Sequence, residues 1–164
     1  MKKLINTALV YLIAGAAAGV FFREFTNFAQ FTGQTTLGLM HPHLLVLGFA
    51  VFLIATLFAL QDDFTGDKLF KPFYIVYNVG LVVTVCMMLV RGVVEVTGAP
   101  LAMPAAISGI AGIGHILIGV GLVLLTVMFK RVVNRKLATR LRARLRDRPR
   151  EALRPDVGGF VVLA

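Results

Sequence analysis

Four long apolar runs divide the sequence and restrict what it can fold into. They cover residues 4–22, 37–60, 73–96 and 105–129, with short polar segments between them. At ~1.5 Å per residue, each run is long enough as a helix to cross the ~30 Å hydrocarbon core of a bilayer. The chain is 58% hydrophobic with a mean hydropathy of +0.85, more than a soluble domain of 164 residues can bury. Because such runs span membranes as helices, we expect an all-α fold, a bundle of four transmembrane helices.

The basic residues indicate how these helices are oriented. Lys2 and Lys3 precede the first run, Lys68 and Lys71 lie between the second and third, and an Arg-rich tail follows the fourth. All three clusters fall on one side of the membrane if both termini are cytoplasmic, which the positive-inside rule favours. We therefore expect a multi-pass protein of the bacterial cytoplasmic membrane. Cleavage of the first run as a signal peptide is the alternative, although this run is long for one.

The strong positive charge belongs to the C-terminal tail. Residues 130–154 hold eleven of the 17 Lys and Arg, and the tail carries about +8 of the net +9. We therefore divide the chain into a membrane domain, 1–129, and a basic cytoplasmic tail, 130–164. Leu137, Leu141 and Leu145 recur at helical spacing among arginines, which is typical of an amphipathic helix on anionic lipid. The alternative is a solvated tail that only fixes topology. Nucleic-acid binding is not expected, because the segment is short and tethered to the bilayer.

The ionisable residues inside the apolar runs gather near one face of the membrane. Given the predicted orientation, the histidines and two ion-pair candidates all fall in the outer half of the bundle: Arg23, Glu24, His41, His43, Arg91, Glu95 and His115. Ionisable groups in a membrane are costly, so they point to a functional site. A histidine can also serve only as an interhelical hydrogen-bonding group. Three histidines at similar depth favour a metal or haem site, because neutral imidazole is a common ligand of both.

Arg91 and Arg23 are the candidate partners of an anionic group such as a haem propionate. Arg91 lies four residues before Glu95, however, and the two can also satisfy each other as a structural ion pair. Arg23, next to Glu24, can equally be an anchor at the membrane interface.

The fourth run has a face suited to a flat ligand. Ser108, Gly112, His115 and Gly119 fall along one side of a helix. Gly112 and Gly119 lack a Cβ, so a macrocycle could lie beside His115. The same small residues could instead allow close helix packing, as in many membrane helices.

The second run leaves the choice between His41 and His43 open. The two are about 200° apart around a helix, and Pro42 between them can bend it. Gly38 and Gly48 lie near the His41 face, whereas His43 is deeper and begins a run that echoes the one after His115. This echo suggests an internal repeat of two helices, which would set two histidines facing each other.

Five short elements resemble a family of small four-helix bacterial membrane proteins of unknown function. They are Arg23-Glu24-Phe25-Thr26, Thr35-Thr36-Leu37-Gly38, His41-Pro42-His43-Leu44, Val90-Arg91-Gly92 and the stretch from Ser108 to His115. The likeness covers about residues 1–129. The His-x-His-Leu start of an inward helix is more distantly similar to helices of the haem–copper oxidase superfamily, including NnrS-like proteins. This second resemblance implies haem b or copper, but three histidines are too few for a complete oxidase core.

The sequence leaves three functions open. The first is a haem b protein with His115 and either His43 or His41 as axial ligands, for electron transfer or diatomic gas binding. The second is a copper site of His41, His43 and His115, with a thioether from Met40. The third is a cofactor-free structural or accessory subunit. A homo-oligomer or a respiratory-chain partner is expected in the membrane, and no motif decides whether the chain is an enzyme.

Overall fold

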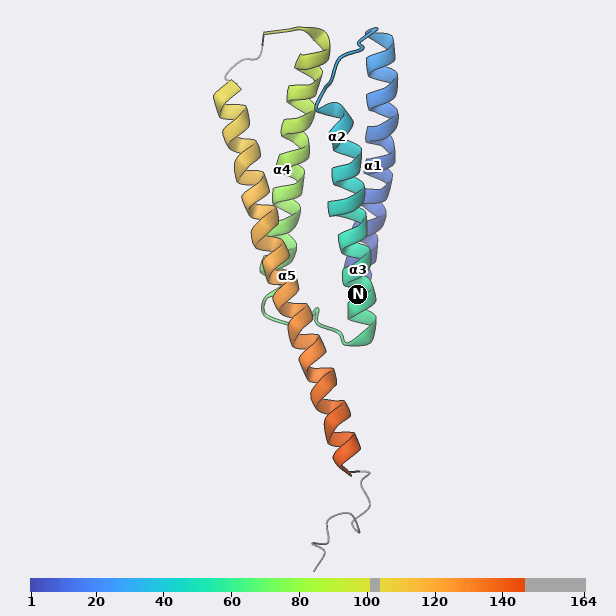
Figure 1. The fold of residues 1–164 in the computed structure, drawn as a ribbon, viewed down its shortest axis with the longest axis vertical. Helices are drawn as coiled ribbons and strands as arrows, with labels where there is room; N and C mark the ends of the chain where they lie inside the picture. The colour runs from blue at the N-terminus through green and yellow to red at the C-terminus, as the bar shows by residue number, and fades with distance from the viewer. Residues whose placement is uncertain (101–103, 147–164) are drawn as a thin grey trace, which may run out of the picture.

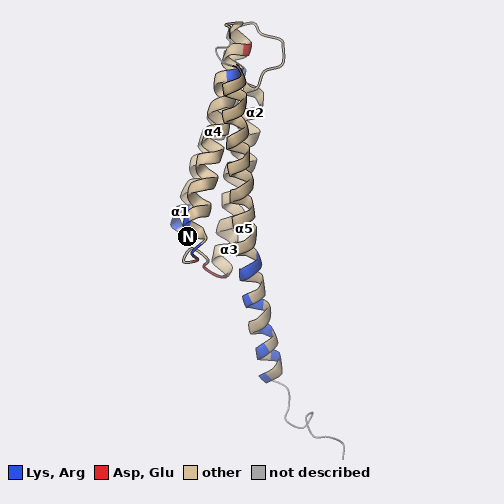
Figure 2. Ribbon diagram, turned by 90° about the vertical axis from the view of Figure 1, so that its left-hand side faces the viewer, with Lys and Arg blue, Asp and Glu red and all other residues tan. Residues whose placement is uncertain are grey.

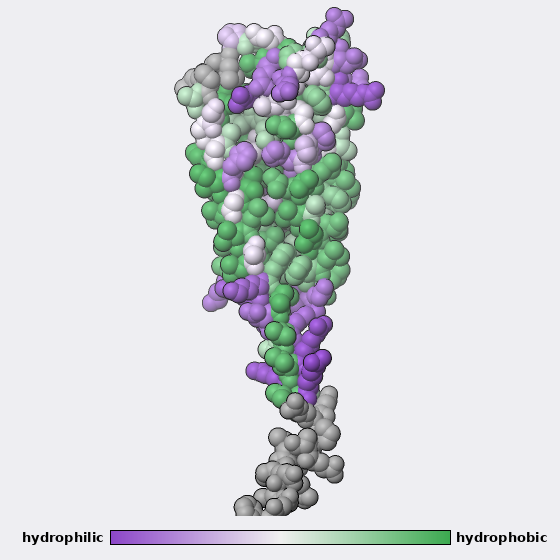
Figure 3. Space-filling model, in the orientation of Figure 1, coloured by the Kyte–Doolittle hydropathy of each residue, from purple (hydrophilic) through white to green (hydrophobic). Residues whose placement is uncertain are grey.

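The computed structural model describes residues 1–100 and 104–146, and every regular element in that part of the chain is a helix (Figure 1). The elements are α1 (Lys2–Phe28), α2 (Leu37–Pro42), the π-helix η1 (His43–Ala50), α3 (Val51–Gln61), α4 (Phe70–Thr97) and α5 (Pro104–Arg146). Because α2, η1 and α3 follow one another directly, the described residues form four long helices. Each is long and apolar enough to cross a membrane, which confirms the predicted all-α class with four such helices. Figure 3 shows the apolar belt, with hydrophilic residues at both of its ends.

The four helices are arranged as two hairpins standing side by side (Figure 1). In one hairpin α1 packs along α2, η1 and α3, and in the other α4 packs along α5. The hairpins meet where α4 contacts α2 and η1, and again where α3 contacts α5. The fold thus brings the second and fourth apolar runs close together without packing them along their full length.

An aromatic cluster forms the centre of the bundle. The Phe52 ring on α3 lies between 5.7 and 6.0 Å from the rings of four neighbours, namely Tyr11, Phe73, Tyr74 and Tyr77. Phe52, Phe73 and Tyr77 are fully buried. Because these rings come from α1, α3 and α4, their packing joins the two hairpins.

Glycines allow α4 and α5 to approach closely. A Cβ built on Gly80 would lie 2.8 Å from the backbone nitrogen of Ile118, and one on Gly121 would lie 2.7 Å from the Tyr77 ring. A Cβ on Gly114 would collide with the hydroxyl of Thr84. The sequences of α4 and α5 therefore provide small residues where the two backbones approach each other, as in other membrane helix pairs.

The second long helix changes its hydrogen-bond pattern at His43. Pro42 has no backbone N–H, so the usual bond to the carbonyl four residues earlier cannot form there. Residues 43–50 then pair as a π-helix, and the amide of Val51 still donates to the carbonyl of Val46, five residues back. π-Helical turns are uncommon and recur at functional sites.

α5 is longer than the fourth apolar run. It continues without a break through the predicted domain boundary at residues 129 and 130 and ends at Arg146, so the helix expected in the tail extends the fourth span (Figure 2). Arg131 pairs with Asp67 at 2.8 Å and Arg135 with Asp62 at 2.9 Å. These pairs tie the first turns of the extension to the loop between α3 and α4. The predicted tail beyond Arg146 lies outside the described residues.

Candidate functional site

The structure brings His43 and His115 together from opposite hairpins. His43 begins η1 and His115 lies on α5, and their ring centroids are 6.2 Å apart with an angle of 86° between the ring planes. The two residues are 72 positions apart in the sequence, so only the tertiary fold makes them neighbours. They are the only pair of imidazoles that the structure places in contact within residues 1–100 and 104–146.

Both imidazoles are held by the same local hydrogen bond. Nδ1 of His43 lies 2.7 Å from the carbonyl oxygen of Leu39, and Nδ1 of His115 lies 2.8 Å from that of Ala111. A carbonyl only accepts, so each Nδ1 carries the proton in the neutral ring. The Nε2 atom of each ring therefore keeps its lone pair. Metal-binding histidines are commonly oriented in this way, with the other ring nitrogen donating to a carbonyl.

The separation of the rings suits one metal ion between them. An ion bound to two imidazole nitrogens on opposite sides, at about 2.0 Å each, holds the ring centroids about 6 Å apart. The observed distance is 6.2 Å. Haem iron accepts two axial imidazoles, so the pair also offers the type of ligand that a haem would need.

The glycines of α5 divide into two sets with different surroundings. No atom lies within 4 Å of a Cβ built on Gly112 or Gly119, whereas Gly114 and Gly121 face α4 at close range. Close packing therefore uses Gly114 and Gly121. Gly112 and Gly119, on the His115 side of the helix, leave open space. The sequence had left these two uses of the glycines undecided.

Arg91 lies beside His115. A pocket of ≈ 150 Å³ is lined by both residues together with Met87, Met88 and Ser108, among others. The Nε atom of Arg91 donates to Glu95 at 2.9 Å, and its side chain is 53% exposed. Within the described residues, Nη1 and Nη2 of Arg91 make no hydrogen bond. The guanidinium can therefore serve Glu95 and an anionic group at the same time.

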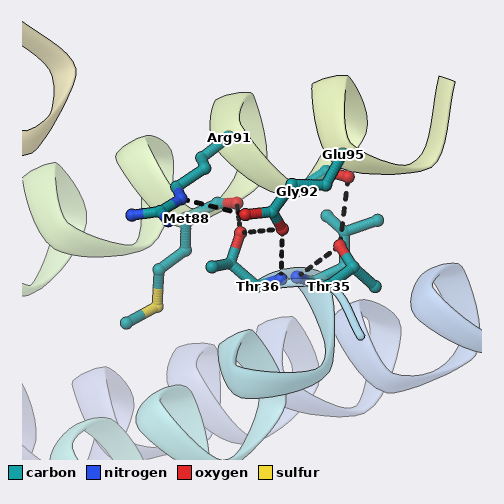
Figure 4. A network of polar contacts seen from close by, with 7 residues as sticks. Thr35, Thr36, Met88, Arg91, Gly92 and Glu95 are labelled. Carbon is teal, nitrogen blue, oxygen red and sulfur yellow. Dashed lines mark hydrogen bonds and ion pairs between the residues drawn. The ribbon is translucent and has the colours of Figure 1, made fainter. Parts of the chain in front are cut away.

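Glu95 joins the end of α4 to the start of α2 (Figure 4). Its Oε2 accepts from the backbone N–H of Thr36 at 2.7 Å and from the Thr36 hydroxyl at 3.1 Å. The Thr35 hydroxyl donates to the carbonyl of Gly92 at 3.1 Å. The ion pair between Arg91 and Glu95 is thus part of a larger hydrogen-bond network. Sequence reasoning assigned no role to the two threonines, although threonines directly before an apolar helix are a recognised start signal.

His41 points away from the histidine pair. It packs against α1, where a Cβ on Gly19 would lie 3.6 Å from the Cβ of His41. Its Nδ1 is buried and has no hydrogen-bond partner. In the part of the chain that the structure describes, His, Cys, Asp and Glu form no group of three that could hold a metal ion. The three-histidine set considered for copper is therefore not assembled here.

Arg23 and Cys86 both face outward. The Arg23 side chain is 85% exposed and lies 3.9 Å from Glu24, as expected of an interfacial anchor. Its only ion pair in the described residues is with that neighbour. Cys86 is exposed on α4. A helix that faces lipid exposes apolar and thiol groups alike.

The sequence was compared with known families, curated proteins and solved structures. A family model described as a protein of unknown function, DUF2871, matches residues 1–132. The chain belongs to this family. The match covers the four apolar helices and the first turn of the α5 extension, so the DUF2871 region contains both facing histidines. No curated protein and no solved structure matches the chain. The predicted resemblance to a family of unknown function is confirmed, and the wider likeness to the haem–copper oxidase superfamily stays a prediction.

Proposed function

We propose that this protein binds b-type haem between η1 and α5, with His43 and His115 as the two axial ligands. The observation that supports it is the pair of facing imidazoles, 6.2 Å apart, each with Nδ1 bonded to a backbone carbonyl. Gly112 and Gly119 leave room beside His115 for the edge of a macrocycle. Bound haem would supply a one-electron redox centre, and the chain would hold its iron from both sides.

Two axial ligands favour electron transfer over gas binding, because no position on the iron remains open. We propose that Arg91 contacts a propionate, since its outer guanidinium nitrogens are not used by Glu95. Arg23 is a weaker candidate for this role because its side chain faces outward. An electron-transfer protein needs a redox partner, for which a respiratory-chain protein or a second copy of this chain is the candidate.

We further propose that the protein lies in the bacterial cytoplasmic membrane with both termini in the cytoplasm. Apart from Arg23 and Arg91, the described Lys and Arg residues gather at the end of the bundle where the chain begins and along the extension of α5 (Figure 2). Such a distribution marks the cytoplasmic side. The histidine pair then lies in the outer half. The matching bonds from His43 and His115 to carbonyls four residues earlier are consistent with a two-helix repeat.

Copper is the second candidate for the group that His43 and His115 bind. The pocket beside His115 is also lined by Met87 and Met88. Thioether and imidazole groups suit Cu(I), and the distance between the rings fits a bare ion. A cofactor-free subunit, in which the polar groups only fix helix packing, is the third possibility.

Absorption spectroscopy of the purified protein tests the proposal. We expect a Soret band and a b-type pyridine haemochrome spectrum after expression in haem-replete cells. His43→Ala and His115→Ala should each lower haem occupancy at least as much as the roughly 10–100-fold that losing a supporting group costs a metal site. His41→Ala is the matched control and should keep its haem, because His41 faces α1.

Three other outcomes separate the alternatives. Protein that stays colourless after haem addition but holds stoichiometric copper by elemental analysis would favour the copper site. Protein that holds neither would leave the structural role. Loss of haem in His41→Ala with retention in His43→Ala would contradict the choice of axial ligand.

A further inference from the structure

A groove follows the seam between α1 and α4, at the end of the bundle opposite the histidine pair. Its wider part has a volume of ≈ 680 Å³ and is lined by charged and apolar residues, including Lys2, Lys3, Phe70, Lys71, Tyr74 and Ile75. A second part of ≈ 420 Å³ is lined by Lys3, Thr7, Val10, Tyr74, Asn78 and Val82, among others. Lys3 and Tyr74 line both parts, so the two adjoin each other. The groove therefore runs from a basic mouth toward the apolar belt.

The mouth of the groove has a strong positive charge. Lys2, Lys3 and Lys71 are exposed, and none of them forms an ion pair within residues 1–100 and 104–146. The carboxylate of nearby Asp63 is held by Thr65, accepting from its amide at 2.9 Å and from its hydroxyl at 2.6 Å. Three ammonium groups around one opening suit a phosphate group.

The inner part of the groove is suited to an acyl chain. Four of its polar side chains pair with one another, because the Tyr74 hydroxyl lies 2.6 Å from that of Thr7 and the Tyr11 hydroxyl donates to Asn78 at 2.7 Å. Val10 and Val82 are exposed at 62% and 52%. Val10 lies seven residues beyond Lys3, about 10 Å deeper along the helix.

We propose that this groove binds one anionic phospholipid. The phosphate contacts Lys2, Lys3 and Lys71, and an acyl chain lies along Val10 and Val82. A soluble phosphate compound would use only the mouth, whereas a lipid uses both parts. Basic pockets between membrane helices hold lipid headgroups for the same reason. The site is separate from the histidine pair and does not depend on a haem.

Native mass spectrometry of the full chain in detergent tests this proposal. We expect phosphatidylglycerol to be retained about tenfold more than phosphatidylcholine. Lys71→Gln should weaken phosphatidylglycerol binding about fivefold, since one basic residue near a headgroup contributes about that factor. Lys68→Gln removes the same charge from the adjacent loop, does not line the groove and should bind as the unchanged protein does.

A second pair of variants tests the acyl part. Val82→Trp should block retention of both lipids by filling the groove, whereas Val79→Trp adds the same ring to α4 outside the groove and should not. Circular dichroism would verify that all variants keep their helix content. Equal losses in Lys68→Gln and Lys71→Gln, or full retention in Val82→Trp, would overturn the proposal. So would complete displacement of the lipid by millimolar inorganic phosphate, which would identify a soluble anion as the ligand.

Discussion

Two residue types with opposite surroundings define the candidate site. The two histidines lie next to each other, whereas the two glycines have no neighbouring side chain on their open face. The carbonyls of Leu39 and Ala111 fix the rings of His43 and His115, so both Nε2 atoms are available as ligands. Gly112 and Gly119 keep the adjacent face of α5 free of side chains. Single substitutions can therefore separate ligand binding from helix packing.

At the residue scale, we expect Gly112→Leu and Gly114→Ala to have different effects. Leucine at position 112 should fill the open face, and haem occupancy should fall while the stability of the haem-free protein stays unchanged. Alanine at position 114 should clash with Thr84 and destabilise the α4–α5 pair by about 1–3 kcal/mol. Unfolding in detergent and the Soret absorbance measure the two effects. Gly109→Leu is the control for the first, because Gly109 is also open but lies to one side of the 108–119 face.

At the scale of single elements, two features differ most from the four regular helices that the sequence predicts. They are the π-helix η1 and the extension of α5. Pro42 removes one hydrogen bond, and the π-helical turns that follow begin at the proposed ligand His43. The extension carries exposed Leu137, Leu141 and Leu145 beyond the turns that Arg131 and Arg135 tie to the loop. A helix with apolar and basic faces tends to bind an anionic bilayer surface.

For the extension, we expect residues from Leu137 onward to lie on anionic lipid. A spin label on Leu141→Cys, in a Cys86→Ser background, should report membrane contact in vesicles that contain phosphatidylglycerol. High salt should weaken this contact, because exposed charges are screened. A label that reports bulk solvent in anionic and neutral vesicles alike would show that the extension is a projecting, solvated helix.

At the scale of the whole molecule, polar contacts at both ends hold the two hairpins together. Glu95 ties α4 to the start of α2, and Asp67 accepts from Arg131 of α5 at the opposite end. The backbone amide of Leu69 and the Arg131 guanidinium hold the pKa of Asp67 below its usual range. The folded protein therefore favours the ionised form of this carboxyl.

Linkage gives the sign of the resulting pH dependence. A lowered folded-state pKa contributes stability that is fully present above the unfolded-state pKa and is lost as the pH falls through the folded-state value. We expect the thermal midpoint of the protein in detergent to fall on acidification below the ordinary range of aspartate. Asp67→Asn should lower the thermal midpoint at neutral pH and make its fall on acidification less steep. Glu24→Gln, at the other end of the bundle, should leave the steepness of that fall unchanged. An equally steep fall in Asp67→Asn would contradict this assignment.

The sequence by itself determined the four helices. Hydropathy and length identify the four helices, because a bilayer requires about 20 apolar residues in a row. It placed the domain boundary at residue 130 because the composition changes there. A helix ends at a residue that breaks its backbone pattern, however, and no Gly or Pro occurs between residues 122 and 146. α5 therefore continues.

Only the tertiary structure shows how the surroundings of neighbouring candidates differ. His41 and His43 are the same residue type in the same apolar run. In the fold, α1 packs against His41, whereas α5 places His115 next to His43. The periodicity of an ideal helix could not predict this, because Pro42 and the π-helical turns change the angle between successive side chains. The roles of the α5 glycines were decided in the same way, by whether another helix lies against them.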